Sequence, residues 1–298
     1  MGQQIINGLF LGSIYALFAL GYTLVFGVLD ILNLAHAAVF MLASFFALAL
    51  STQLHLPIAG ALPLTMVLAG LLGLLLERVA FRPLRGRADS NIAGLISSLA
   101  MATVFEAIAL EVWGPNIRRF PEGTLPAATV SFRIEIPLVG GSVSLLQLAV
   151  ISVAMVLVLG LTFLVRRSRL GREVRAVAES PRAAQVLGVN VDRTIAASFF
   201  ISSALGGAAG ILYGLSYNAI SPDMGGSVEL KGLAVIIVGG MGSMPGAVVA
   251  GFALGLIEVF VVAHLGASFR DAVSFAALFL VVVLRPRGLF GAASMREA

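Results

Sequence analysis

Apolar stretches long enough to cross a membrane recur along this 298-residue chain. A spanning helix needs about 20 apolar residues to cross roughly 30 Å of hydrocarbon, whereas a membrane β-barrel is built from alternating segments of about 10 residues. Hydrophobic residues make up 59% of the sequence and charged residues only 11%, a composition that excludes an ordinary soluble domain. The sequence therefore predicts an all-α integral membrane protein.

Nine apolar segments follow one another, and two of them are too short to cross a membrane as straight helices. At 1.5 Å per residue, residues 37–51 and 230–241 would reach only about 22 and 18 Å. Such interrupted segments often line a pathway. The predicted fold is one transmembrane domain over residues 1–298, a polytopic helical bundle of about 8–9 segments with two short, broken or re-entrant helices. The segments lie at 4–28, 37–51, 57–77, 91–112, 143–165, 194–216, 230–241, 245–264 and 271–284.

The positive charges indicate which loops face the cytoplasm. Fourteen of the eighteen arginines lie in three patches outside the apolar runs, at 78–87, at 166–193 and in the tail from Arg285. The positive-inside rule places all three patches on the cytoplasmic face and explains the high pI without nucleic-acid binding. The loop at 113–142 is then expected outside, where its TVSFRIEIPL alternates apolar and polar residues as a strand of a small hairpin would. The side of the N-terminus stays open, because each re-entrant segment reverses the count of crossings.

Several chemistries are excluded by missing residue types. The chain has no cysteine, and its three histidines, His36, His55 and His264, lie far apart without the spacing of metal ligands, so no metal site is expected. The single lysine, Lys231, is followed by Gly232, so the chain cannot contain a P-loop. We expect no catalytic residues and no cofactor bound by this chain.

Glycines cluster in the second half of the sequence, several of them four residues apart. Small residues at this spacing let helix backbones approach closely in lipid. We expect chiefly packing within the chain, with a subunit interface as the alternative. The two clusters are Gly206, Gly207, Gly210 and Gly214, and Gly242, Gly246, Gly251 and Gly255.

The basic segment at 166–193 differs from the rest of the chain, because it is polar and yet helix-forming. Gly171 ends the preceding basic run, residues 173–179 can form a short helix, and Ser180 with Pro181 reads as the start of another. We expect Gly188 and then Asn190 to end that second helix. The resulting helix, break and helix would offer a partner an apolar knob made by Ala183, Ala184 and Leu187. The alternative is an amphipathic element lying on the membrane surface.

This segment resembles the ATPase-coupling loop of bacterial ABC importer permeases, most closely those of the branched-chain amino-acid type. It carries the pattern G-x3-RA-x-A-x-x-P-x-AA-x-x-x-G-x-N. Further similar stretches are NGLFLGSIYALFALGYTLVFGV, LNLAHAAVFMLASF, SPDMGGSVELKGLAVIIVGGMGSMPGAVVAGFALGLIE and RPRGLFG, in family order over nearly the whole length. The coupling residues implied are Gly171, Arg175, Ala176, Ala178, Pro181, Ala183, Ala184, Gly188 and Asn190.

The resemblance implies the shorter of two membrane subunits of an ATP-driven importer for branched-chain or related small amino acids. The implied partners are a second related permease subunit, in a homo- or heterodimer, two cytoplasmic ABC ATPases that hold ATP and Mg, and an extracytoplasmic solute-binding protein. The implied location is the lipid of a bacterial cytoplasmic (inner) membrane. After His36 the sequence departs from the family pattern, because Ala37 and Ala38 stand where a glycine and a polar residue are common. Import of urea or short amides by the same machinery therefore stays open, as does an ATP-independent channel or secondary carrier.

Polar residues at two helix breaks are candidates for the substrate pathway. Asn33 and His36 precede the second segment, and the other break carries Gly239, Gly240, Gly242 and Ser243 within GGMGSMPG. The alternatives are simple helix caps and a tight turn between packed helices. Glu106 and Glu258 lie within apolar segments, where a carboxylate costs at least about 2–3 kcal/mol unless it faces water or a partner, or is protonated. These two residues either serve transport or brace the bundle.

Overall fold

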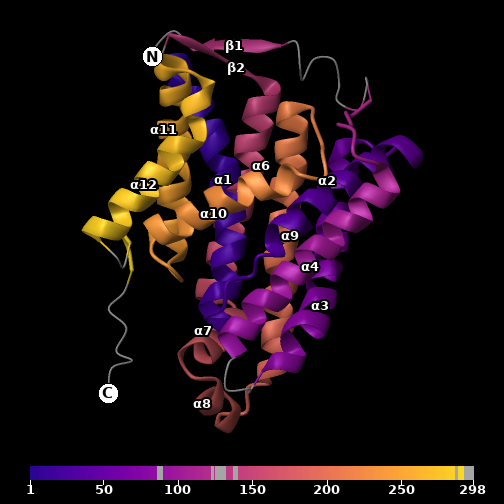
Figure 1. The fold of residues 1–298 in the computed structure, drawn as a ribbon, viewed down its shortest axis with the longest axis vertical. Coiled ribbons are helices and arrows are strands. Elements are labelled where there is room, and N and C mark those ends of the chain that lie inside the picture. Colours follow the sequence, from indigo (N-terminus) through magenta and orange to yellow (C-terminus); the bar gives the residue numbers. More distant parts are fainter. Residues whose placement is uncertain (86–89, 122–123, 125–131, 137–139, 286–287, 292–298) are drawn as a thin grey trace. The chain divides into compact units, whose positions relative to one another are not determined.

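The computed structural model describes residues 1–85, 90–121, 124, 132–136, 140–285 and 288–291, and these are mostly helical (Figure 1). Eight helices are long and apolar enough to cross a membrane, which confirms the polytopic all-α fold. The helices are α1 (Gly2–Leu29), α2 (His36–Gln53), α3 (Ile58–Leu76), α4 (Ser90–Trp113), α6 (Leu145–Arg167), α7 (Arg169–Glu179), α8 (Pro181–Val186), α9 (Val191–Tyr217), α10 (Met224–Gly239), α11 (Met244–Leu265) and α12 (Arg270–Leu284). The short turns η1 (Glu77–Phe81) and η2 (Arg82–Leu84) continue α3, and η3 (Ala267–Phe269) precedes α12.

The two segments predicted to be short differ in the structure. Helix α2 extends to the polar residues before Leu54 and reaches 18 residues, which places it among the eight possible spans. Helix α10 begins earlier than predicted, at Met224, but its 16 residues correspond to only about 24 Å. Helix α10 therefore stays shorter than the hydrocarbon thickness, and it ends at the glycine break.

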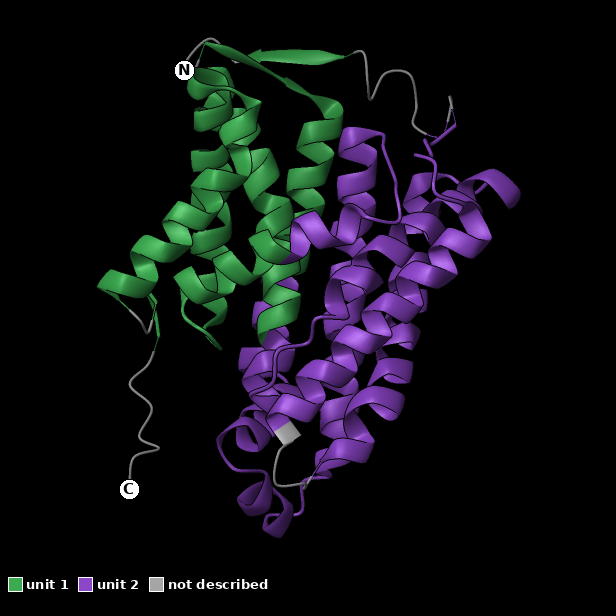
Figure 2. Ribbon diagram, viewed as in Figure 1, with its two compact units in different colours: residues 1–23, 126–158, 230–298 green, residues 24–125, 159–229 purple. Residues whose placement is uncertain are grey.

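The helices group into two compact units (Figure 2). In the unit made of residues 24–125 and 159–229, α2, α3 and α9 pack against one another, and α4 packs on α2. In the unit made of residues 1–23, 126–158 and 230–298, α11 packs against α12 and against the first part of α1. Both units are assembled from distant parts of the sequence.

Glycines allow close helix packing inside each unit. A Cβ added at Gly207 of α9 would lie 2.5 Å from the Cβ of Ala69 in α3. In the other unit, a Cβ at Gly251 of α11 would lie 2.6 Å from the backbone of Ala16 in α1. Since real Cβ atoms do not approach so closely, only glycine fits at these positions, and packing within the chain is confirmed for both clusters.

A small hairpin occupies part of the loop at 113–142. Strand β1 (Arg133–Ile136) pairs antiparallel with β2 (Gly141–Ser144), with Arg133 opposite Ser144. The side-chain oxygen of Gln3 accepts a hydrogen bond from the Ser142 amide at 2.9 Å and ties the hairpin to the start of α1. The hairpin prediction is confirmed at these residues, whereas 122–123, 125–131 and 137–139 lie outside the described part of the loop.

Candidate functional site

The first helix of the candidate coupling loop is capped by Ser168, directly after the end of α6. The Ser168 hydroxyl caps α7 by accepting a hydrogen bond from the Gly171 amide at 2.9 Å. The short helix predicted over residues 173–179 is present but begins earlier, at Arg169, so Gly171 lies inside α7. A side chain there would collide with the carbonyl oxygens of Leu164 and Val165. Gly171 therefore lets α7 fold back closely against the end of α6.

One face of α7 holds the loop against its own unit. Val174 and Val177 are buried on that face, and the helix packs on α8 and α9. Arg175 donates a hydrogen bond to the carbonyl of Val165, at the end of α6. Arg175 therefore secures the first helix of the loop. Ala176 and Ala178 are half-buried on the same helix.

The second helix of the loop, α8, begins as predicted. The Ser180 hydroxyl accepts a hydrogen bond from the Ala183 amide at 3.3 Å, and Pro181 occupies the first helical position. The helix closes at Gly188, whose φ of +83° suits glycine and lets the Val189 amide reach the carbonyl of Ala184 at 3.0 Å. Since α8 has only six residues, these capping contacts hold it in place.

The exposed apolar surface of α8 differs from the predicted knob. Ala184 is only 1% exposed and faces the unit, whereas Ala183 is exposed. The large exposed apolar side chains at the end of α8 are Val186, at 87%, and Leu187, at 80%. We name these two residues the α8 tip. Neighbouring large apolar side chains projecting from a polar loop are typical of a contact with a partner.

Asn190 begins the next helix and does not end α8, which corrects the prediction for this residue. Its side-chain oxygen caps α9 by accepting a hydrogen bond from the Arg193 amide at 3.0 Å, and the Thr194 hydroxyl donates to its carbonyl. Asp192 follows in the first turn of α9, where a negative charge is favourable.

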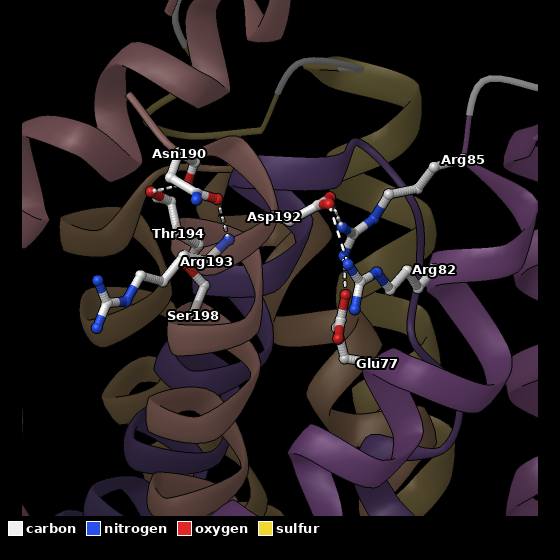
Figure 3. Close-up of polar contacts among 8 residues, drawn as sticks. All are labelled: Glu77, Arg82, Arg85, Asn190, Asp192, Arg193, Thr194 and Ser198. Atoms are coloured by element: carbon white, nitrogen blue, oxygen red, sulfur yellow. Dashed lines mark hydrogen bonds and ion pairs between the residues drawn. The ribbon is translucent and has the colours of Figure 1, made fainter. Parts of the chain in front are cut away.

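Charged side chains connect this exit of the loop to the end of α3 (Figure 3). One carboxylate oxygen of Asp192 lies 2.8 Å from Arg85, and the other lies 3.2 Å from Arg82. Arg85 also forms an ion pair with Glu77 in η1, whose side chain is only 3% exposed. The sequence analysis missed Asp192, because its partner Arg82 lies 110 residues away in the sequence. It also missed Glu77, whose partner Arg85 lies eight residues away.

The candidate pathway residues Asn33 and His36 lie together in the α1–α2 connection. Both are buried, and the Asn33 carbonyl accepts a hydrogen bond from the His36 amide at 3.1 Å. The Asn33 amide group is buried without a hydrogen-bond partner among the described residues. Ser98 of α4, which the sequence analysis did not identify, accepts a hydrogen bond from the Leu34 amide at 3.1 Å and holds this connection.

The other candidate pathway residues lie in the unit made of residues 1–23, 126–158 and 230–298, at the turn between α10 and α11. Gly240 and Gly242 have φ values of +100° and +81°, and Ser243 caps α11 by accepting a hydrogen bond from the Gly246 amide. The Gly239 carbonyl accepts from the Phe290 amide at 3.0 Å, so the closing segment at 288–291 pairs with the break. The turn thus joins two closely packed helices, as one of the sequence alternatives expected.

The two intramembrane carboxylates have different surroundings. Glu258 is 1% exposed and lies 3.0 Å from Lys231 and 3.1 Å from Arg270, and it accepts a hydrogen bond from Tyr15. Lys231 also pairs with Asp271 at 3.2 Å. Glu258 therefore braces α1, α10, α11 and α12 through one cluster of charges. In the described residues, no group of three or more histidine, aspartate or glutamate side chains is arranged to bind a metal ion.

Glu106, in contrast, is half-buried in α4 and interacts electrostatically with a second carboxylate, Glu229 of α10. One oxygen of Glu229 is buried and has no hydrogen-bond partner among the described residues. One acidic group of α4 and one of α10 therefore lie close enough to interact.

The chain is similar to known transport proteins over almost its whole length. Residues 4–282 match the family of branched-chain amino acid transport system permease components. The chain is 35% identical over 297 residues to the high-affinity branched-chain amino acid transport system permease protein BraD of Pseudomonas aeruginosa, covering 97% of this chain and 95% of the relative. It is 35% identical over 303 residues to the corresponding protein LivH of Escherichia coli K12, with the same coverage. A probable LivH of Methanocaldococcus jannaschii is 26% identical over 302 residues, 98% of this chain and 93% of the relative.

Proposed function

The chain belongs to the family of permease components of branched-chain amino acid transport systems, and from this premise we propose that it is the membrane subunit of an ATP-driven importer. Its cargo is a branched-chain or related small amino acid, as the names of its relatives suggest. The eight possible spans make it a multi-pass membrane protein, which we assign to the cytoplasmic membrane of a bacterium.

The partners we propose are those that such a permease needs. Two cytoplasmic ATPases bind and hydrolyse ATP with Mg, a second related permease subunit completes the pathway, and an extracytoplasmic binding protein delivers the amino acid. The absence of a P-loop in the sequence agrees with ATP being bound by other chains.

The observation that carries this proposal is the α8 tip. Val186 and Leu187 project from a short, doubly capped helix that the packed face of α7 holds against its own unit. A soluble partner with an apolar groove is the kind of surface that would cover such a tip. Because the apolar face of α7, with Val174 and Val177, is buried against its own unit, a membrane-surface anchor explains the loop less well.

In the proposed mechanism, ATP binding closes the two ATPases and moves the coupling loops that they hold. Each loop is fixed to its unit by the Ser168 cap, the Arg175 contact and the Asn190 cap, so the movement reaches α6 and α9. The helices then change between outward-facing and inward-facing arrangements. ATP shifts the equilibrium between these two arrangements, because it binds more tightly to the ATPases in one of them than in the other.

The experiment that tests the proposal is purification of the chain with its candidate ATPases. We expect co-elution with the wild-type chain and its loss when Val186→Glu and Leu187→Glu are combined. The matched control is Leu54→Glu, because Leu54 is also exposed, at 61%, but lies in the α2–α3 connection at the other end of α3. Ala184 is not a suitable target, since it is buried and its substitution would disturb the fold.

Uptake into proteoliposomes then decides the cargo. With the binding protein and ATP present, we expect uptake of leucine, isoleucine or valine but not of urea. ATPases that stay bound to the α8 tip variant would show that the docking surface lies elsewhere. If the wild-type chain binds no ATPase and conducts solute without ATP, an ATP-independent channel or carrier replaces the proposal.

A further inference from the structure

A chain of alternating charges runs from the exit of the coupling loop to the end of α3. Asp192 lies two residues after the Asn190 cap, and its carboxylate contacts Arg82 at 3.2 Å and Arg85 at 2.8 Å. Both arginines lie at the end of the α3 extension, more than a hundred residues earlier in the sequence. Asp192 therefore joins the loop to an element that sequence order does not bring near it (Figure 3).

The inner end of this chain is anchored in the protein interior. The Arg85 guanidinium contacts Asp192 with one terminal nitrogen and Glu77 with the other, and its side chain is only 20% exposed. The Glu77 side chain is 3% exposed, and an unpaired carboxylate would be costly in that position. The planar guanidinium with two fixed donors thus connects an exposed carboxylate to a buried one.

Open space lies beside this connection at the level of the loop. A cavity of about 720 Å³ lies there, lined on one side by Phe81 and Leu84 and on the other by Pro181 and Gln185. Because the space is open, α8 and the end of α3 are not packed together across it. The ring contact between Phe81 and Phe199 lies about two turns further along α9 than Asp192. The charges beside the cavity therefore connect the loop exit to the end of α3.

We propose that the Asp192–Arg85–Glu77 chain transmits movement of the coupling loop to α3, so that ATP hydrolysis is coupled to substrate movement. This inference rests on the proposed function, because it assigns a role within the same importer. Asp192 and Arg85 act as positioning residues that hold the first turn of α9 against the end of the α3 extension, beyond the part of the two helices that packs closely. They bind neither the substrate nor ATP.

The test uses Asp192→Asn in the complete importer, because Asp192 is 56% exposed and its replacement leaves the buried Glu77–Arg85 pair intact. We expect the ATPases to co-elute as with the wild type and to hydrolyse ATP. Uptake per ATP hydrolysed should fall by about two- to thirty-fold, the range for single residues on a coupling route. The control is Asp223→Asn, an exposed aspartate before α10 that forms no ion pair within the described residues.

A covalent link provides a rescue that a merely structural role would not predict. The chain has no cysteine, so Arg82→Cys with Asp192→Cys introduces the only two thiols. We expect a short bifunctional thiol reagent to restore uptake per ATP in this variant, and one-ended labelling to leave it low.

The outcomes separate this inference from the proposed function. Unchanged uptake per ATP in Asp192→Asn overturns the inference, as does loss of ATPase binding, which would make Asp192 a docking residue. A wild-type complex without ATP-dependent uptake counts against the proposed function itself.

Discussion

Replacing Glu258 with glutamine should destabilise the protein by an amount that its buried ion pairs determine. The Glu258 side chain is 1% exposed and that of Lys231 is 10% exposed, so both charges depend on each other and not on water. Removing one partner of a buried pair typically costs about 3–5 kcal/mol. We expect the lower end of this range, about 3 kcal/mol, because both cations that lose Glu258 keep some compensation. Lys231 still pairs with Asp271 at 3.2 Å, and the Arg270 side chain is 36% exposed to solvent. At roughly 2 °C per kcal/mol, the unfolding midpoint should fall by about 6 °C or more.

The measurement is a series of heated samples analysed by size-exclusion chromatography in detergent, since the chain has no cysteine for a thiol-reactive dye. The decisive comparison is with a double variant that combines Lys231→Met and Glu258→Met. Replacing both partners of a buried pair by apolar residues is often neutral or stabilising, and the remaining partners reach solvent. The double variant should therefore unfold at a higher temperature than Glu258→Gln. The reasoning would be refuted if Glu258→Gln unfolded at the same temperature as the wild type. It would also be refuted if the double variant unfolded at or below the temperature of Glu258→Gln.

Three further predictions concern packing and caps. Gly210→Ala should destabilise the protein in the same heating assay, because its Cβ would collide with the Phe40 carbonyl; Gly160→Ala, where the space is open, should be neutral or slightly stabilising. Asn190→Ala should cost about 1 kcal/mol through loss of the α9 cap, and Asn190→Asp should retain most of the stability; equal midpoints for the two would contradict the cap. Ser98→Ala should increase hydrogen exchange of the Leu34 amide, measured by mass spectrometry, and unchanged protection would exclude that hydrogen bond.

The sequence predicted well those features that depend on local pattern. Apolar runs located the spans, and Ser180 with Pro181 located the start of α8, because capping is decided within a few residues. The glycine spacing also predicted close helix packing. Asn190 was placed in the loop but misread as an end, since an asparagine can cap either end of a helix.

The features that the sequence could not predict depend on distant residues. The face of α8 that is buried is decided by packing within its unit, and so Ala184 proved buried and Val186 exposed. Lys231 was noticed only as the single lysine, because nothing nearby in sequence announces its pairing with Glu258. Charges in apolar segments indicate that a partner exists, but only the fold identifies it.

The assembly of one unit from both ends of the chain determines when that unit can fold during synthesis. The hydrogen bond between Tyr15 and Glu258 joins residues 243 positions apart. The glycine groove of α1 at Gly8 and Gly12 is filled by α11. At a synthesis rate of about 5–20 residues per second, roughly 12–50 s pass between the synthesis of α1 and that of α11. Until then this part of α1 lies in the bilayer without its final neighbour. A chain truncated before α11 therefore leaves the Gly8 and Gly12 face of its first helix uncovered, and the membrane's proteolytic quality control should remove it.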